Sequence, residues 1–472
     1  MASAEIGVIG LGVMGANLAL NIADHGFDVA VYNRTEERTR EFAAGAGELS
    51  DKIIPTGSLE EFVAAIRPPR PVIIMIKAGD PVDQQIAALK PLLENNDIII
   101  DAGNANFRDT MRRFEELKDT GLTFIGMGVS GGEEGARFGP SIMVGGTEAS
   151  WNRVSDVINA ISAKFNDEPC AAWLGENGAG HFVKTIHNGI EYADMQMIAE
   201  IYGIMRDGMG MKAPEMAGVF DAWNSGPLDS FLVEITSKVL ATEDDKTGKP
   251  LVDIILDAAG QKGTGRWSAI ESQQMAVPAS AIEAAVGARS LSAMTGLRAE
   301  AEDLLGRPDL GSFEAGGDAV ALLEQALLAG KVAAYAQGFA VMAAASKEFG
   351  WNLPMPIIAK IWRAGCIIRS RFLDEISEAF TKTPDVANLV MTPEFSRIVK
   401  ETDGALRTVV AEAVRKGLPV PALSSAVAYF DQLRRARGTA NLIQAQCDFF
   451  GAHGFERIDG KGENHGPWHM GS

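Results

Sequence analysis

The hydrophobic and polar positions divide the chain into two regions of different periodicity. In the first region, short apolar runs alternate with amphipathic stretches of helical spacing. The apolar runs predict strands at Glu5–Gly10, Asp28–Tyr32, Val72–Ile76, Asp97–Asp101, Thr123–Met127 and Ser141–Val144. The stretches between them predict helices that include Met14–His25, Glu36–Gly45 and Thr110–Thr120. Because strands that alternate with helices are typical of a parallel sheet with crossovers, we assign residues 1–178 to an α/β domain.

In the second region the pattern becomes helical. Ala, Leu, Met and Glu recur at helical spacing, and the longest segments predict helices at His181–Met209, Leu228–Thr242 and Asp318–Phe349. The last of these is apolar almost all round, which is typical of a helix buried at the centre of a domain or subunit. We therefore predict a large all-α domain over residues 179–442. The Gly-rich, polar residues 443–472 form an extended tail that either frays or is held by a partner.

Composition narrows the class of protein. A chain of 472 residues is too long for one ordinary core. It has no apolar run of about 18 residues and no N-terminal signal pattern, and its three cysteines are widely spaced, so we expect a cytoplasmic protein without a membrane span, disulfide framework or metal site. The net charge of −19 argues against nucleic acid as a partner. A phosphorylated small molecule is still allowed, because it needs only a local cluster of Lys and Arg.

A glycine-rich turn follows the first predicted strand and opens the next helix. It reads Gly10-Leu11-Gly12-Val13-Met14-Gly15. In this setting G-x-G-x-x-G is the fingerprint of a Rossmann domain, because the glycines let the backbone approach a pyrophosphate that the helix N-terminus then binds. The alternative is a glycine-rich turn that binds nothing. We favour a dinucleotide site.

The residues after the second strand indicate which dinucleotide binds. Asn33-Arg34-Thr35 stand where an NAD enzyme usually has an acidic residue for the ribose 2′-hydroxyl. Arg34 can instead pair with a 2′-phosphate in bidentate fashion, so NADP is favoured over NAD. The alternative is that Arg34 is simply an exposed residue after a strand.

One predicted helix carries a polar face. Lys184, His187, Asn188, Glu191 and Tyr192 fall on one side of it at about 100° per residue. Lys184 and Glu191 are two turns apart, which leaves room for a small ligand between a potential base and a potential acid. An exposed face with salt bridges is the competing interpretation, and the helix alone does not decide between the two.

Several longer stretches resemble the 6-phosphogluconate dehydrogenase family. Besides the glycine turn and VYNRT, they are IIDAGNANFRDT, GVSGGEEGARFGPSIMVGG, GAGHFVKTIHNGIEYADMQ, AGQKGTGRW and NLIQAQCDFFGAH. The resemblance spans nearly the whole chain. It implies a Rossmann domain, a large helical domain and a C-terminal tail that reaches the other subunit of a homodimer.

The resemblance also implies an activity: oxidative decarboxylation of 6-phosphogluconate to ribulose 5-phosphate and CO2, with reduction of NADP, in the pentose phosphate pathway and gluconate utilization. Lys184 would be the base that takes the C3 hydroxyl proton and then the acid that assists loss of CO2. Glu191 would protonate C1. No metal is implied.

The family's binding residues carry over by position. Those for substrate are Asn104, Ser130, Gly131, Gly132, His187, Asn188, Tyr192, Lys262, Arg289 and, from the partner's tail, His453. Those for the cofactor are Gly10, Leu11, Gly12, Val13, Met14, Gly15, Asn33, Arg34, Thr35, Met75, Ile76, Lys77 and Asn104, with Met14 and Lys77 near the nicotinamide.

The chain departs from the family at one position. Cys447 stands where the family has a tail arginine that clamps the substrate phosphate. A thiol cannot make that bidentate, charged contact. Either a nearby Arg434, Arg435 or Arg437 replaces it, or the phosphate site is weakened, or Lys262 and Arg289 suffice.

Two other functions compete with this interpretation. A related 3-hydroxyacid dehydrogenase acting on an unphosphorylated acid would share the glycine turn and the lysine, but such relatives are much shorter. A non-catalytic NADP-binding protein would be free to lose Lys184 and Glu191, and this chain has kept both.

Overall fold

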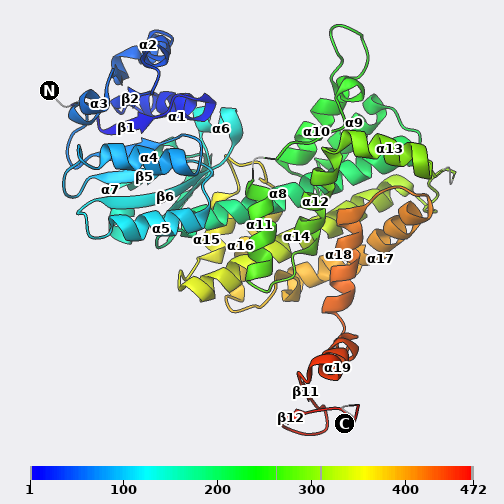
Figure 1. Ribbon diagram of the computed structural model, residues 1–472. Coiled ribbons are helices and arrows are strands. Elements are labelled where there is room, and N and C mark those ends of the chain that lie inside the picture. The colour runs from blue at the N-terminus through cyan, green and yellow to red at the C-terminus, as the bar shows by residue number, and fades with distance from the viewer. Residues whose placement is uncertain (1–2, 262, 309–310, 469–472) are drawn as a thin grey trace. The chain divides into compact units, whose positions relative to one another are not determined.

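The computed structural model describes residues 3–261, 263–308 and 311–468. They form two compact units, of which the first ends at Ala426 and the second begins at Val427. The first unit contains a sheet with its covering helices and then a large helical part (Figure 1). The α/β Rossmann domain followed by an all-α region is therefore confirmed.

An eight-stranded sheet forms the core of the N-terminal part, in the order β10-β7-β6-β5-β4-β1-β2-β3. Its strands are β1 Ile6–Ile9, β2 Val29–Tyr32, β3 Ile53–Pro55, β4 Pro71–Ile74, β5 Ile98–Asp101, β6 Thr123–Val129, β7 Ile142–Gly145 and β10 Ala171–Gly175. All six predicted strands are present within two residues of the predicted bounds. The short β3 and β10 were not predicted, nor was the small hairpin β8 Lys164–Phe165 with β9 Glu168–Pro169.

The predicted parallel sheet is present, with one antiparallel pair that was not predicted. Strands β6 and β7 are antiparallel, while the other pairs of the large sheet are parallel. The connection between them contains the short α6, Gly132–Phe138, which packs against α1, Val13–Asp24. Because this connection does not cross the sheet, the chain re-enters it in the opposite direction.

Helices cover both faces of the sheet, as Figure 1 shows. Besides α1 and α6 they are α2 Glu36–Ala44, α3 Leu59–Ala65, α4 Asp80–Leu89, α5 Phe107–Leu117 and α7 Glu148–Ile161. Adjacent residues of β1 point to opposite faces: Val8 packs in the same apolar cluster as Leu18, and Ile9 in the cluster that contains Phe62. Burial on both faces explains why the strands read as continuous apolar runs.

The remainder of the first unit is helical. Its helices are α8 Ala179–Gly203, α9 Ala213–Trp223, α10 Phe231–Ala241, α11 Thr264–Gln274, α12 Ser280–Ser292, α13 Thr295–Leu305, α14 Ala319–Phe349, α15 Met355–Ile361, α16 Phe372–Lys382 and α17 Pro393–Arg415. α8 ends in a π turn at Ile204–Gly208, and single 3₁₀ turns lie at Gly47–Lys52, Leu251–Ile254 and Leu389–Met391. The following α18, Pro421–Leu433, runs into the second unit.

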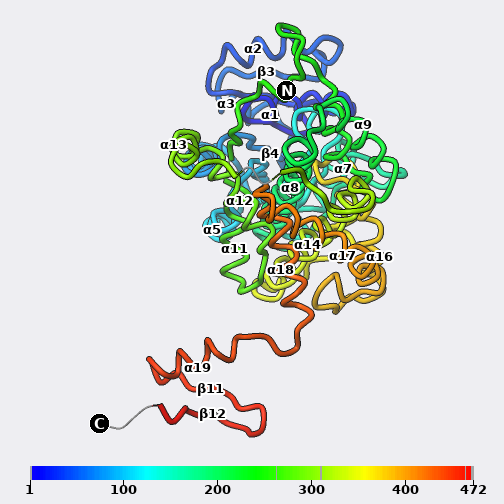
Figure 2. The backbone as a smooth tube through the Cα atoms, turned by 90° about the vertical axis from the view of Figure 1, so that its right-hand side faces the viewer, coloured from blue at the N-terminus to red at the C-terminus, as the bar shows by residue number. Residues whose placement is uncertain are grey.

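α14 is the central helix of this part. It is long and apolar enough to cross a membrane, but 89% of its most apolar window is buried inside the protein. It packs against α8 and α17, and both views place α14 beside α8 (Figures 1 and 2). Its one buried ammonium, Lys331, binds both carboxylate oxygens of Asp194 on α8 at 2.7 and 2.6 Å. The predicted burial of this segment is confirmed.

The second unit carries the tail. α19, Ala440–Gly451, is followed by a small antiparallel hairpin of β11, Phe455–Glu456, and β12, Glu463–Asn464. Figure 2 shows these elements in succession as the red end of the tube.

Candidate active site

Glycines bring α8 into direct contact with the sheet. A Cβ on Gly180 would lie 2.5 Å from both the Gly145 nitrogen and the Met143 oxygen. A Cβ on Gly128 of β6 would lie 2.5 Å from the Cβ of Lys184. Only glycine permits so close an approach, and as a result the side chain of Lys184 reaches the carboxyl end of β6.

A chain of hydrogen bonds begins at Lys184. Its Nζ lies 3.0 Å from the Oγ of Ser130, which follows β6, and 3.4 Å from Nδ1 of His187. His187 Nε2 lies 3.4 Å from the same serine oxygen, and its Nδ1 lies 3.7 Å from a carboxylate oxygen of Glu191. The predicted base, the predicted acid and two predicted substrate contacts therefore form one cluster.

The flanking substrate residues are held from neighbouring helices. Asn188 Oδ1 lies 3.1 Å from His187 Nδ1, and Asn188 Nδ2 donates to Thr264 Oγ1 on α11 at 2.8 Å. The guanidinium of Arg289, on α12, lies 3.8 Å from the centre of the Tyr192 ring, which orients a cation toward the same face of α8.

Burial sets the protonation of this cluster. Burial lowers the pKa of Lys184, against an opposing effect of the Glu191 charge. Burial and the neighbouring lysine lower the pKa of His187 well below its usual value, so this ring is neutral near pH 7. Burial raises the pKa of Glu191 against the opposing charges of Lys184 and Arg289. The lowered pKa favours a neutral Lys184, which can act as a base, and the raised pKa favours a protonated Glu191, which can act as an acid.

The loop after β6 has a conformation that requires glycine. Gly131 has φ +107° and Gly132 has φ +63°. A Cβ on Gly131 would lie 2.6 Å from the Gly365 oxygen, so the loop is packed against the segment after α15. Its backbone stays beside Ser130, where a carboxylate could meet bare N–H groups.

The glycine turn after β1 fits a pyrophosphate. Gly10 has φ +97°, and a Cβ there would lie 2.5 Å from the Met75 oxygen. A Cβ on Gly15 would lie 1.9 Å from the Gly10 oxygen, so α1 starts tightly against the turn. At Gly12, by contrast, a Cβ would meet nothing within 4 Å, and no side chain caps α1. The exposed Gly12 and Val13 thus leave the N–H groups at the start of α1 open to a phosphate.

The loop after β2 is tied to this turn. Asn33 Oδ1 accepts the N–H of Leu11 at 3.2 Å, and Thr35 begins α2 as its N-cap residue. Arg34 between them is exposed, and its guanidinium forms no salt bridge with the described residues. A cation held beside the phosphate turn fits a ribose 2′-phosphate.

A buried ion cluster joins the two loops that complete the predicted cofactor site. Arg113 on α5 donates to Asp101 at 3.1 Å and to the Gly79 carbonyl at 3.0 Å, while Asp101 accepts the Gly103 N–H at 3.1 Å. This ion cluster therefore fixes two loops relative to each other. One follows β4 and carries Met75, Ile76 and Lys77, and the other carries Asn104.

Two residues that contact the cluster were not predicted, and two predicted residues cannot be placed beside it. Thr264 and Trp362, whose ring stands edge-on to His187 with centroids 5.4 Å apart, were not predicted. Thr264 belongs to the stretch AGQKGTGRW, which resembles the family and could have indicated it, whereas no sequence pattern marks Trp362. Lys262 lies outside the described residues. His453 belongs to the second unit, just after α19, and its approach to the Lys184 cluster stays a prediction.

Comparisons with known proteins point to one family. Residues 5–175 match the family described as the NAD binding domain of 6-phosphogluconate dehydrogenase, and residues 180–468 match its C-terminal domain. The chain is 49% identical to an NADP(+)-dependent decarboxylating 6-phosphogluconate dehydrogenase of Bacillus subtilis, covering 99% of this chain and 100% of that protein. It is 46% identical to an NAD(+)-dependent one from the same organism, covering 98% and 99%.

A solved structure has the same fold throughout. The Plasmodium falciparum 6-phosphogluconate dehydrogenase, determined in its apo form and in complex with NADP+ and with 6-phosphogluconate, superposes with a TM-score of 0.95 at 40% identity. The match covers 98% of this chain and 100% of that one.

Proposed function

The chain belongs to the 6-phosphogluconate dehydrogenase family, and from that premise we propose how its own residues carry out the reaction. The enzyme oxidises 6-phosphogluconate, decarboxylates the product to ribulose 5-phosphate and uses NADP. The observation that carries the assignment of roles is the buried cluster of Ser130, Lys184, His187 and Glu191, in which a lysine and a carboxyl have pKa values shifted toward each other.

Lys184 acts first as a base. Burial favours its neutral amine, which takes the proton of the substrate's C3 hydroxyl as hydride leaves C3. NADP, when bound, accepts that hydride. Ser130 and His187 fix the position of Nζ at 3.0 and 3.4 Å. Because His187 is neutral, it does not add a second positive charge beside the ammonium that forms.

The same residue then acts as an acid. The protonated Lys184 donates to the C3 oxygen of the 3-keto acid, so that oxygen takes up the electron pair released when the C1 carboxylate leaves as CO2. Glu191 then gives its proton to the enediol carbon that was C2 of the acid and becomes C1 of the product. The neutral Lys184 takes back the proton of the hydroxyl on the neighbouring carbon, which yields the ketone of ribulose 5-phosphate. A raised pKa keeps Glu191 protonated for this step, and its place two turns along α8 puts the acid on the same face as the base.

Substrate and cofactor are held by the loops around this cluster. The backbone of Ser130-Gly131-Gly132 receives the substrate carboxylate, with Asn104, Asn188 and Tyr192 around the hydroxyls and Lys262 and Arg289 toward the phosphate. The turn Gly10–Gly15 receives the pyrophosphate, and Asn33, Arg34 and Thr35 receive the 2′-phosphate of the adenosine ribose.

The chain has three functional parts. Residues 1–178 bind the cofactor, residues 179–442 bind the substrate and form the dimer, and residues 443–472 are the tail.

Two subunits associate, and the tail of each brings His453 to the site of the other. Large apolar side chains that are exposed in a single chain support this association; they are Leu291, Met294, Leu297, Leu304 and Leu305 on and near α12 and α13, and Leu442, Ile443, Phe449 and Phe450 on α19. Three free cysteines fit a reducing, cytoplasmic location.

The test measures NADPH by absorbance and released CO2 in parallel, with NADP and 6-phosphogluconate. Equal amounts of both products are expected, with no comparable turnover of gluconate. NADPH without CO2, or equal rates with gluconate, would contradict the proposed reaction.

A further inference from the structure

The tail contains a carboxylate that is completely buried and fully hydrogen-bonded. Asp448 on α19 has no exposed surface. Its Oδ1 accepts the Gly454 N–H at 2.8 Å and lies 2.7 Å from His465 Nδ1. Its Oδ2 accepts the Gly466 N–H at 2.8 Å and the Trp468 indole N–H at 2.9 Å. Asp448 therefore joins the helix to both ends of the segment that contains the hairpin.

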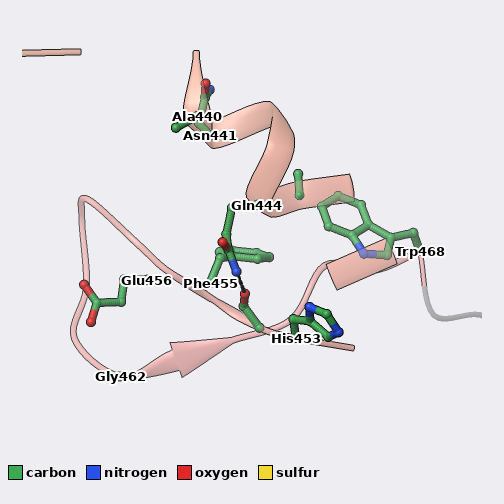
Figure 3. Close-up of a pocket in the computed structure, with 10 residues that line it drawn as sticks. Ala440, Asn441, Gln444, His453, Phe455, Glu456, Gly462 and Trp468 are labelled. Carbon is green, nitrogen blue, oxygen red and sulfur yellow. Dashed lines mark hydrogen bonds between the residues drawn. The ribbon is translucent and has the colours of Figure 1, made fainter. Parts of the chain in front are cut away.

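A second side chain of α19 binds the same loop, the segment after the helix that contains His453 and Gly454. Gln444 lies one helical turn before Asp448, on the same face. Its Nε2 donates to the Gly454 carbonyl at 2.7 Å, which Figure 3 shows as a dashed line beside His453. The Gly454 N–H is bound by Asp448, so both backbone polar groups of the residue after His453 are fixed by side chains of the helix.

The backbone before His453 is fixed as well. Ala452 ends α19 in the left-handed region at φ 50°, and its N–H donates to the Asp448 carbonyl at 2.8 Å. A Cβ on Gly451 would lie 2.5 Å from Nε2 of His453, so the imidazole folds back over this glycine and a larger residue there would displace the ring. The Phe450 ring stands edge-on to this imidazole, with centroids 5.7 Å apart.

We propose that Asp448 and Gln444 are positioning residues, which hold His453 in a preformed loop so that the tail presents its imidazole to 6-phosphogluconate already oriented. This inference rests on the proposed role of His453 as a substrate-binding residue. The four donors around Asp448 require a group that only accepts hydrogen bonds, and an ionised carboxylate is the side chain with enough acceptor sites.

The energetic reason is preorganisation. His453 is exposed in the single chain, and an exposed loop without the clamp would have to be ordered when substrate binds. The four hydrogen bonds of Asp448 and the one from Gln444 order this loop before substrate binds. Less conformational entropy is therefore lost in the binding step. Weakening the clamp should therefore lower affinity for the substrate and leave the chemistry of Lys184 and Glu191 unchanged.

The experiment uses full-length enzyme carrying Asp448→Asn or Gln444→Leu. Asp448→Asn keeps the shape but turns a donor toward Gly466 or Trp468. We expect each variant to raise KM for 6-phosphogluconate about tenfold, while kcat stays within about threefold and Kd for NADP is unchanged. Asp459→Asn, which breaks an exposed salt bridge to Arg457 in the same segment, and Gln446→Leu, at an exposed position of α19, are the matched controls.

Double variants with His453→Ala separate positioning from a general structural effect. If the clamp acts through His453, adding Asp448→Asn or Gln444→Leu to His453→Ala raises KM no further. Additive losses, or single variants that behave like the controls while His453→Ala raises KM, overturn the inference. An unchanged KM for His453→Ala itself would instead overturn the proposed role of that residue. If Asp448→Asn does not fold by circular dichroism, Gln444→Leu and its double variant decide the question.

Discussion

The Nζ of Lys184 and the Oγ of Ser130 lie 3.0 Å apart, although the first belongs to α8 and the second follows β6, 54 residues earlier. This bond crosses from the sheet to the helical part. It aims the lysine amine at the carboxyl ends of the strands, where ligands of open α/β sheets bind.

Replacing Lys184 by Met should reduce kcat by roughly a hundredfold to ten-thousandfold, the usual contribution of a general base. Kd for NADP should not change. The loss should not come from unfolding, because Met fills a similar buried volume without a polar group that needs hydrogen bonds. Lys347→Met, at an exposed position near the end of α14, is the control. A Lys184→Met enzyme with normal kcat would rule out this residue as the base.

The pH profile of kcat/KM should be bell-shaped. Activity rises with pH as the ammonium of Lys184 loses its proton, and the lowered pKa of Lys184 places this limb below the usual range of lysine. Activity falls as Glu191 ionises, at a pH above the usual range of a carboxyl, because its pKa is raised. Glu191→Gln should lower kcat and abolish the alkaline limb alone. An alkaline limb that persists in this variant would contradict the assignment of the acid.

Cys447→Arg should lower KM for 6-phosphogluconate, because a guanidinium can hold the phosphate in bidentate fashion and a thiol cannot. Cys447 is partly exposed and precedes the buried Asp448, so the larger side chain has space to extend. Cys447→Ser should leave KM unchanged. An unchanged KM for the arginine variant would mean that the phosphate site is not weakened.

Arg34→Ala should weaken NADP binding much more than NAD binding, because only NADP carries the 2′-phosphate. Isothermal titration with both cofactors measures this difference directly. The exposed Arg38, on the adjacent α2, provides Arg38→Ala for comparison. Equal losses for the two cofactors would contradict the role given to Arg34.

Stability should depend on Glu200 of α8. Its carboxylate accepts the N–H groups of Ala422 and Leu423 at the start of α18, yet burial raises its pKa to about 7. A folded-state pKa above the unfolded value means that the contribution of Glu200 to stability is fully present below about pH 4.5 and is lost as pH rises through about 7, by up to about 3 kcal/mol.

Glu200→Gln should therefore raise Tm relative to the parent at pH 8 by more than at pH 5.5. Scanning calorimetry at both values measures this difference. Glu348→Gln, at an exposed position of α14, should show no such trend. A Tm difference that is the same at both pH values would contradict the raised pKa.

The sequence by itself determined the elements and the cofactor turn. Apolar runs placed β1, β2, β4, β5, β6 and β7, and the spacing of Lys184, His187 and Glu191 placed three site residues on one helix face, because periodicity is a local property of the chain. The matched stretches identified the family.

Only the tertiary structure decided the rest. The direction of β7 depends on where α6 packs, and β3 is too short to show a period. The shifted pKa values of Lys184 and Glu191 come from burial, and burial depends on α8 lying against β6. The four hydrogen-bond donors of Asp448 could not be predicted from the sequence. They lie 6 to 20 residues further along the chain and reach Asp448 only when the hairpin has formed.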